Sequence, residues 1–371
     1  MLGILSTILF NLFCFIVIIS VIVFIHEFGH FYVARLNGVL VEEFSIGFGK
    51  KIFSFRDKKK TIWKFCLLPF GGYVKMFGDK NGASVPDQAM IAAMTAAERK
   101  ISFINKNVYQ RIAIVGAGPL ANFILAIFLF TILFKINGVN KIEPIVSATV
   151  KDSPSFHAGL QKGDKIIAVN DDKISDFYEL RNKIVVGLEK NLKLTIERNN
   201  QIIEINLSTR DTIQKNAFDE DVSMPSIGMI VDNVTNVKLN ILQSFIHANV
   251  ETFDISVKIF KTLGQLISGQ RSIKELGGPI KIAKYSGKTV ELGLNMIIWF
   301  TAMISINLGV MNLLPVPVLD GGHLFFYTIE ALRRGKPIPL KYQNIGYNIG
   351  FAIIAALMIF TTINDVILII K

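Results

Sequence analysis

The sequence predicts a multi-pass α-helical membrane protein with four spans, a β-rich hairpin region on its cytoplasmic side and one inserted extracytoplasmic α/β domain. Of the 371 residues, 51% are hydrophobic and only 19% are charged, whereas soluble domains carry about 25% charge. Four runs without ionisable residues are long enough to cross a bilayer. A more polar segment from about residue 143 to 232 separates the second run from the third. This composition excludes disordered, collagen-like and disulfide-scaffold proteins.

The four charge-free runs define the predicted spans, at residues 1–25, 112–134, 292–319 and 342–364. The first run lacks a basic leading segment and is too long for the core of a signal peptide, so we expect it to remain as a span. Four spans place both chain termini on the same side of the membrane. Spans one and three then run in the same direction, and their C-terminal ends reach the same depth.

The distribution of charge predicts the orientation of these spans. The loop 36–107 holds 12 Lys and Arg against 6 acidic residues, and the loop 332–341 holds four basic residues and no acid. Because basic loops stay in the cytoplasm, both loops are predicted to be cytoplasmic, with both termini and the inserted domain outside. The two loops account for most of the net charge of +11. The basic excess is therefore a topology signal and does not indicate a nucleic-acid partner.

The first cytoplasmic loop is predicted to be partly β. Apolar segments at 39–48, 52–55 and 62–68 flank a charged turn at 57–60, and Pro69 is expected to end the last of them. Four glycines, Gly47, Gly49, Gly71 and Gly72, punctuate these segments, as glycine does where backbones turn tightly or approach closely. A weak helix is expected at 89–98.

The inserted segment is predicted to fold as a small α/β module. Strands are expected at 146–150, 164–170 and 173–174, a helix begins at the capping box 176–179, and a hairpin at 192–197 and 202–207 turns at Asn199 and Asn200. Residues 241–267 follow with an amphipathic helical pattern. This helix could lie on the membrane surface or pack on the spans, and we expect a linker from it to residue 291.

A candidate metal site directly follows the first span, in the sequence His26-Glu27-Phe28-Gly29-His30. Residues at i and i+4 share one face of a helix, so the two imidazoles can bind one Zn²⁺ with Glu27 close to the water that the metal activates. Ionisable residues beside a span are costly and indicate function. The alternative is a polar helix end that extends its side chains to the interface.

The third ligand should lie at the same depth on another span, because catalytic zinc usually has three protein ligands. Asp320 directly follows the third apolar run, in a segment that two prolines and two glycines must break. Broken helices are tolerated in membranes where they line a cavity, and water must reach a hydrolytic metal. The alternatives are that Asp320 is only a turn residue, or that His323 is the ligand in its place.

These motifs resemble those of the site-2 protease family, intramembrane zinc metalloproteases, and in particular the bacterial regulator-of-sigma-E type. The family pattern combines HExxH on one span with NxxPxPxLDG on a later one, and residues 26–30 and 312–321 match both. Segments 44–50, 68–75 and 118–122 also resemble family segments, so the likeness covers nearly the whole chain. Residues 153–167 are similar to the SPA…AGL…GD run of bacterial PDZ domains, and the inserted domain is expected to be one.

The resemblance implies hydrolysis of peptide bonds within transmembrane segments of single-span proteins, such as a membrane-anchored anti-sigma factor. Zn²⁺ would be held by His26, His30 and Asp320, and Glu27 would move the proton. Asn312 would hold the substrate backbone or the developing oxyanion, or alternatively bond another helix. Segment 68–75, with Gly71 and Gly72, could capture the unwound substrate as an added strand, assisted by Gly47 and Gly49, or could simply be a structural hairpin.

The implied location is the bacterial cytoplasmic (inner) membrane, with the active site near the cytoplasmic side and the PDZ domain binding a peptide or protein terminus. The competing functions are a membrane metal transporter and a catalytically inactive PDZ scaffold. The expected domains are 1–35 (first span with HExxH), 36–107 (cytoplasmic loop), 108–136 (second span), 140–232 (PDZ), 233–291 (amphipathic helix and linker), 292–331 (third span) and 332–371 (basic loop and fourth span).

Overall fold

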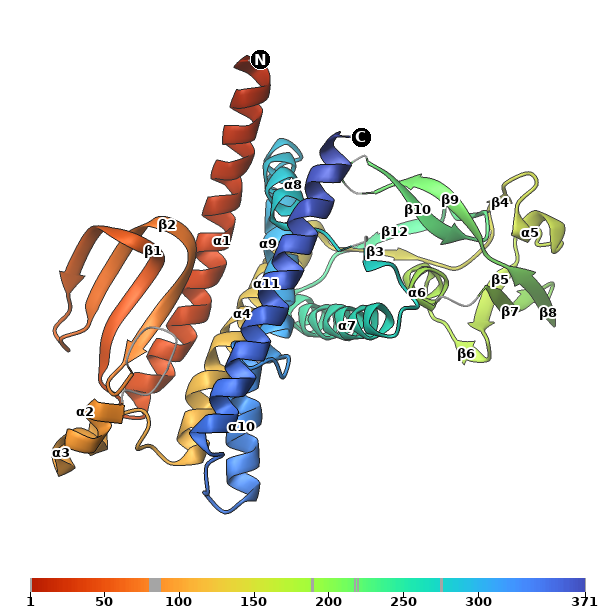
Figure 1. Ribbon diagram of the computed structural model, residues 1–371. Helices are drawn as coiled ribbons and strands as arrows, with labels where there is room; N and C mark the ends of the chain where they lie inside the picture. The colour runs from red at the N-terminus through yellow and green to blue at the C-terminus, as the bar shows by residue number, and fades with distance from the viewer. Residues whose placement is uncertain are drawn as a thin grey trace. The chain divides into compact units, whose positions relative to one another are not determined.

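The computed structural model describes residues 2–79, 88–187, 190–216, 218, 220–273 and 276–370. The chain forms two compact units. The first unit comprises Met1–Thr131, Ala248–Phe260 and Ile273–Lys371, and the second comprises Ile132–His247 and Lys261–Ser272. Figure 1 labels the helices and strands of both units.

Four helices among the described residues are long and apolar enough to cross a membrane, which confirms the four predicted spans. They are α1 (Leu2–Leu36), α4 (Val108–Asn137), α9 (Leu294–Leu313) and α11 (Leu340–Ile370). The third of these ends earlier than the apolar run in the sequence. Helix α9 stops at Leu313 because Pro315 and Pro317 follow, and α10 (Asp320–Leu332) begins at Asp320. The predicted break in the third span is therefore present.

Helix α8 (Pro279–Glu291) occupies the region that we expected to be a linker, so that expectation is wrong. It packs along α1 and also contacts α9 and α11. Gly287 allows the close approach, because a methyl group there would clash with Asn11. The buried Asp365 of α11 caps the first turn of α8 by accepting hydrogen bonds from the backbone N–H groups of Gly278 and Lys281, each at 2.9 Å. No side chain within α8 caps it, which is why a sequence pattern does not reveal this helix.

A long antiparallel hairpin lies against α1, formed by β1 (Val41–Arg56) and β2 (Ile62–Met76). The expected end of the strand at Pro69 is wrong, since β2 continues to Met76. Leu68 pairs with Phe48 and Gly72 pairs with Ile46, so three residues of β2 face one of β1 in a bulge. Proline is tolerated at a bulge, where its missing N–H breaks no ladder bond. The short helices α2 (Gln88–Ala93) and α3 (Ala96–Ile101) replace the single weak helix.

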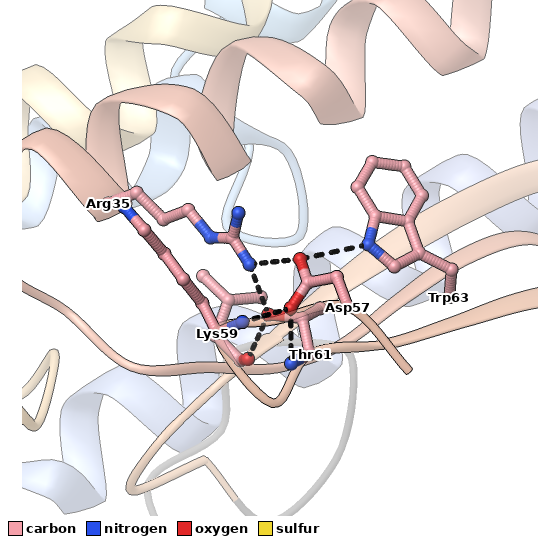
Figure 2. A network of polar contacts seen from close by, with 6 residues as sticks. Arg35, Asp57, Lys59, Thr61 and Trp63 are labelled. Atoms are coloured by element: carbon pink, nitrogen blue, oxygen red, sulfur yellow. Dashed lines mark hydrogen bonds and ion pairs between the residues drawn. The ribbon is translucent and has the colours of Figure 1, made fainter. Parts of the chain in front are cut away.

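A polar network at the end of α1 fastens the tip of this hairpin (Figure 2). Arg35 contacts the carboxylate of Asp57 and donates to Thr61 Oγ1 at 2.8 Å. Asp57 also accepts from Trp63 Nε1 at 3.2 Å and from the backbone N–H of Lys59 and Thr61. The network ties β2 to the helix that carries His26 and His30, and so helps to set the position of the strand beside them.

The second unit contains a four-stranded antiparallel sheet in the order β6 (Asp172–Lys173), β5 (Lys165–Val169), β7 (Asn191–Arg198) and β8 (Gln201–Ser208). Leu180 and Ile184 of helix α6 (Phe177–Gly187) belong to the hydrophobic core of this unit. The hairpin of β7 (Asn191–Arg198) and β8 (Gln201–Ser208) turns at Asn199 and Asn200, both at positive φ, as predicted. The smaller elements of the unit are β3 (Val139–Ile142), β4 (Ala148–Thr149), α5 (Pro154–His157), β5 (Lys165–Val169), β6 (Asp172–Lys173), β9 (Arg210–Lys215), β10 (Asp221–Ser226), β11 (Met229–Ile230) and β12 (Val234–Val237).

Helix α7 (Ile241–Ile267) has the bounds that its hydrophobic pattern predicts, and Asn240 and Gln243 form its capping box. Its large apolar side chains are exposed rather than buried, among them Leu242, Phe253 and Ile267. Its buried positions include the polar Ser244 and Thr252. Apolar Ala248 and Ile255 are buried as well, so the exposed apolar side chains leave both the membrane-surface and the packing alternatives open.

The second unit also contains a buried ion pair that we expect to make its stability depend on pH. Asp164, 1% exposed in its side chain, accepts hydrogen bonds from Nε and a terminal nitrogen of Arg198, both at 2.7 Å. Burial raises the pKa of the Asp164 carboxyl, but the hydrogen bonds from Arg198 and from the Gln161 N–H lower it further, so the pKa lies below its ordinary value.

Replacing Asp164 with asparagine should therefore destabilise the second unit at pH 7 by about 3 kcal/mol. The contribution of the ionised carboxylate is complete above the unfolded-state pKa of about 3.9 and disappears as the pH falls through the lower folded-state pKa. Thermal unfolding of the detergent-solubilised protein at pH 7 and pH 3 should show the variant and the wild type converging at low pH. Asp172→Asn, which removes an exposed ion pair with Lys183, should have little effect, and equal losses in both variants would contradict the prediction.

Candidate metal centre

Three donor atoms from two helices converge in the first unit. His26 Nε2 lies 3.1 Å and His30 Nε2 lies 3.5 Å from Asp320 Oδ2, and the two nitrogens are 3.3 Å apart. Ligands placed tetrahedrally around zinc at about 2.0–2.1 Å would lie about 3.3–3.4 Å from one another. The spacing of these three atoms therefore matches three corners of a tetrahedral zinc site.

The protonation of His30 explains why this cluster favours a cation. His30 Nδ1 lies 2.9 Å from the carbonyl oxygen of Ile114, an acceptor that requires the proton on Nδ1 and leaves Nε2 with a lone pair. Asp320 Oδ2 is buried and accepts no hydrogen bond. His30 Nε2 and Asp320 Oδ2 therefore face each other with lone pairs, and a cation held between them would relieve their repulsion. Two imidazoles and one carboxylate are a donor set that suits zinc.

Local backbone structure brings these donors together. His26 and His30 are one turn apart on α1, and Asp320 is the first residue of α10, where the helix dipole favours a carboxylate. Gly321 and Gly322 allow α10 to begin directly against the chain segment that precedes it. A methyl group at Gly321 would lie 2.2 Å from the carbonyl oxygen of Leu314. The LDGG sequence thus places the third ligand by allowing a close backbone contact.

Helix α4 completes the setting of the two histidines. A methyl group at Gly118 would lie 2.3 Å from His30 Nε2, and one at Gly29 would lie 2.3 Å from the carbonyl oxygen of Ala117. Both glycines are therefore required where α1 and α4 cross. Helix α9 is held against the same part of α4 by a hydrogen bond from Ser305 Oγ to the carbonyl oxygen of Asn122, at 2.9 Å.

Asn122 also holds the ring of His26. Its side-chain amide lies 3.2 Å from His26 Nδ1, and its Oδ1 is buried without a partner. When His26 binds a metal through Nε2, its Nδ1 carries the proton, and Asn122 Oδ1 is then the acceptor within reach once the amide rotates. Asn122 therefore fixes both the orientation and the tautomer of this ligand.

We expect Asn122→Ala to weaken zinc affinity by about 10- to 100-fold, because the partners that orient metal ligands have effects of this size. Competition with a chromophoric chelator on the purified protein measures this directly. Asn137→Ala, at the far end of the same helix, is the matched control. An unchanged affinity in Asn122→Ala would show that the amide does not orient His26.

A cavity of about 470 Å³ opens onto the three donors. Glu27, Gly71, Gly72 and Asn312 line it, so four of the residues proposed for catalysis or substrate binding lie around one space. Gly72 lies so close to Glu27 that a methyl group there would be 3.0 Å from Glu27 Cγ.

The other two predicted substrate-binding glycines, Gly47 and Gly49, are not among the residues that line this cavity. They lie on β1 at positive φ, opposite Leu68 at the bulge of the hairpin. Their position gives them a role in shaping the bulge of β2 and offers no support for direct contact with substrate. His323, the rival ligand, lines the cavity, but its nitrogens are not among the described donor atoms that converge.

Comparison with known proteins agrees with this geometry. The model of peptidase family M50 matches residues 14–357. The chain belongs to peptidase family M50. Relatives named zinc metalloproteases include one from Rickettsia conorii, 41% identical over 95% of this chain and 97% of its own length, and one from Agrobacterium fabrum, 36% identical over 95% and 94%. Metalloprotease MmpA of Caulobacter vibrioides is 33% identical over 94% of this chain and 93% of its own length.

One solved structure also aligns with part of this M50 protease, the PDZ domain of the SdrC-like protein from Listeria innocua. It covers 26% of this chain and 99% of the domain at 18% identity and a TM-score of 0.21. This TM-score is too low to establish the fold of the second unit.

The M50 protease is thus a zinc metallopeptidase and an integral membrane protein of the site-2 protease family. When bound, zinc supplies a Lewis acid that polarises the scissile carbonyl and acidifies the attacking water. Glu27 lines the same cavity, and its carboxylate would accept a proton from that water and deliver it to the leaving amine. His26, His30 and Asp320 are the residues placed to hold the metal, and Asn122 and the Ile114 carbonyl would orient the imidazoles.

Sequence analysis missed three contributors to the centre of this M50 protease. Asn122 and Gly118 belong to a segment that resembles the family, but no motif in the sequence predicts a role for them. Tyr347 lines the cavity from α11 and has no neighbouring motif in the sequence. The available signal for Gly118 and Asn122 was a small residue and a polar residue four positions apart within an apolar run.

Proposed function

We propose that this M50 protease cleaves peptide bonds within the transmembrane segments of single-span membrane proteins, as part of regulated intramembrane proteolysis. A membrane-anchored anti-sigma factor is the substrate type that the family resemblance suggests. The observation that carries the proposal is the composition of the cavity wall. Apolar residues of three candidate spans surround the metal ligands, including Val23 of α1, Leu308 of α9 and Phe351 of α11. A wall of this kind suits an apolar segment.

The substrate segment must unwind, because an α-helix hides its amide groups in internal hydrogen bonds. We propose that the backbone of β2 at Gly71 and Gly72 captures the unwound segment as an added strand beside Glu27. These glycines line the cavity, and the bulge interrupts the pairing of β2 at this point. Asn312 lies on the cavity wall near the end of α9 and is proposed to hold the substrate backbone.

The remaining predictions concern orientation and partners. We propose an inner-membrane protein with cytoplasmic loops at 36–107 and 332–341, both termini outside, and the active site near the cytoplasmic side. The second unit is proposed to be an extracytoplasmic PDZ domain that binds a peptide or protein terminus. The exposed apolar side of α7, with Lys258 and Lys261 nearby, is proposed to rest on the lipid bilayer. No nucleic-acid partner is expected.

The decisive experiment uses purified full-length enzyme and a model single-span substrate, both in liposomes. Mass spectrometry of the products should locate the cut within the apolar segment of the substrate. Cleavage only in polar regions outside that segment would contradict the proposal. The transporter alternative predicts zinc flux into the same liposomes, and Glu27 beside the ligands is unnecessary for transport.

A further inference from the structure

We propose that His323 is a further catalytic residue of this M50 protease, which donates a hydrogen bond from Nε2–H to the scissile carbonyl oxygen as negative charge develops on it. Tyr347 acts through His323 as a positioning residue. The proposal deepens the proposed function at the same site, and it rests on the metallopeptidase activity rather than on the membrane origin of the substrate.

His323 lies in the cavity beside the candidate metal ligands, where a donor to the scissile carbonyl oxygen must lie. It follows Asp320 by three residues on α10, so the two side chains lie on one face of the helix, one turn apart. His323 lines the cavity together with Glu27, Asp320 and Asn312. Its nitrogens lie outside the cluster of converging donor atoms in the described part of the chain. The ring therefore faces the reaction space without being a metal ligand.

Tyr347 determines which nitrogen of His323 carries the proton. The Tyr347 hydroxyl lies 3.2 Å from His323 Nδ1. A phenol is the better donor of the two, so its O–H donates to Nδ1 and the proton of the neutral ring lies on Nε2. Among the described residues no hydrogen-bond partner is recorded for Nε2. Tyr347 thus holds His323 in one tautomer, and the Nε2–H donor has no acceptor among the residues that the structure describes.

The peptidase reaction provides such an acceptor. Attack of water on the scissile carbonyl places negative charge on its oxygen, and fixed donors aimed at that oxygen stabilise the transition state more than the ground state. Removing one donor of this kind typically lowers kcat by 10²- to 10³-fold. Because the interaction strengthens as charge develops, its loss should change kcat far more than KM.

The test measures kcat, KM and zinc content for the detergent-solubilised full-length enzyme with a fluorogenic single-span substrate. His323→Phe should lower kcat by about 10²- to 10³-fold, with KM within about threefold and zinc unchanged. His323→Gln, whose amide N–H can take the place of Nε2–H, should recover at least tenfold over His323→Phe. Tyr347→Phe should lower kcat by about tenfold. Tyr342→Phe, an exposed residue on the same helix, should behave as wild type.

A kcat for His323→Phe within threefold of wild type would overturn the proposal, as would a loss of zinc that accounts for the loss of activity. Failure of His323→Gln to exceed His323→Phe would also count against a donor role. The same kinetics with casein, a soluble unfolded substrate, separate this proposal from the proposed function. If the wild-type enzyme cleaves casein but not the membrane substrate, only the proposal of intramembrane cleavage is refuted. The His323 variants are then compared with casein as the substrate.

Discussion

Replacing Glu27 with glutamine should abolish measurable proteolysis while leaving zinc in place. Glutamine has the same shape and lines the same cavity, but its amide cannot accept a proton from water or pass one to the leaving amine. General acid–base groups contribute about 10²- to 10⁴-fold to the rate, and Glu27 serves both proton transfers, so the loss should reach the upper end of this range. Cleavage of a single-span substrate and metal analysis of the same preparation provide the two measurements.

Glu98→Gln is the matched control, because Glu98 belongs to an exposed capping box of α3 that glutamine can also complete. It should retain full activity. Residual cleavage above about one-tenth of the wild-type rate in Glu27→Gln would contradict the assigned role. A loss of zinc together with activity would assign Glu27 to metal binding in place of proton transfer.

Replacing Gly118 with alanine should cause the second large effect, a loss of zinc binding by more than about 100-fold. The added methyl group would lie 2.3 Å from His30 Nε2 and 2.9 Å from His26 Cε1, so both ligands must move. Alanine is a better helix former than glycine, so α4 itself should not be weakened. Chelator competition and activity should fall together.

Gly116→Ala tests whether this effect comes from the site. It lies two residues away on the same helix, and its methyl group would make only an ordinary contact with Leu324, at 3.9 Å. This variant should bind zinc normally. Equal losses in Gly116→Ala and Gly118→Ala would point to a general intolerance of α4 to substitution and would contradict the steric explanation.

The elements that the sequence predicts well are those whose signal is local. The four apolar runs identify α1, α4, α9 and α11, and the hydrophobic stripe of residues 241–267 predicts α7 with its bounds. The turn at Asn199 and Asn200 fixes the hairpin of β7 and β8. In each case the determining residues lie within the element itself.

The metal centre was predictable because its ligands come in two short motifs and because span direction places them at one depth. His26, His30 and Asp320 do converge in the structure. The parts that sequence reasoning missed depend on contacts between distant segments. Asn122 acquires its role from His26, α8 is capped by Asp365, and β2 passes Pro69 because β1 accommodates a bulge. None of these partners is near in the sequence.

The separation of the ligands along the chain also bears on biosynthesis. Two ligands lie in the first helix, but the third lies at the start of α10, after most of the chain. A nascent chain that has already inserted its first two helices therefore holds only a pair of imidazoles, which is an incomplete ligand set for catalytic zinc. The enzyme can acquire its metal only after α10 has been synthesised and packed. Until then the chain has no complete metal centre, and so no proteolytic activity that depends on zinc.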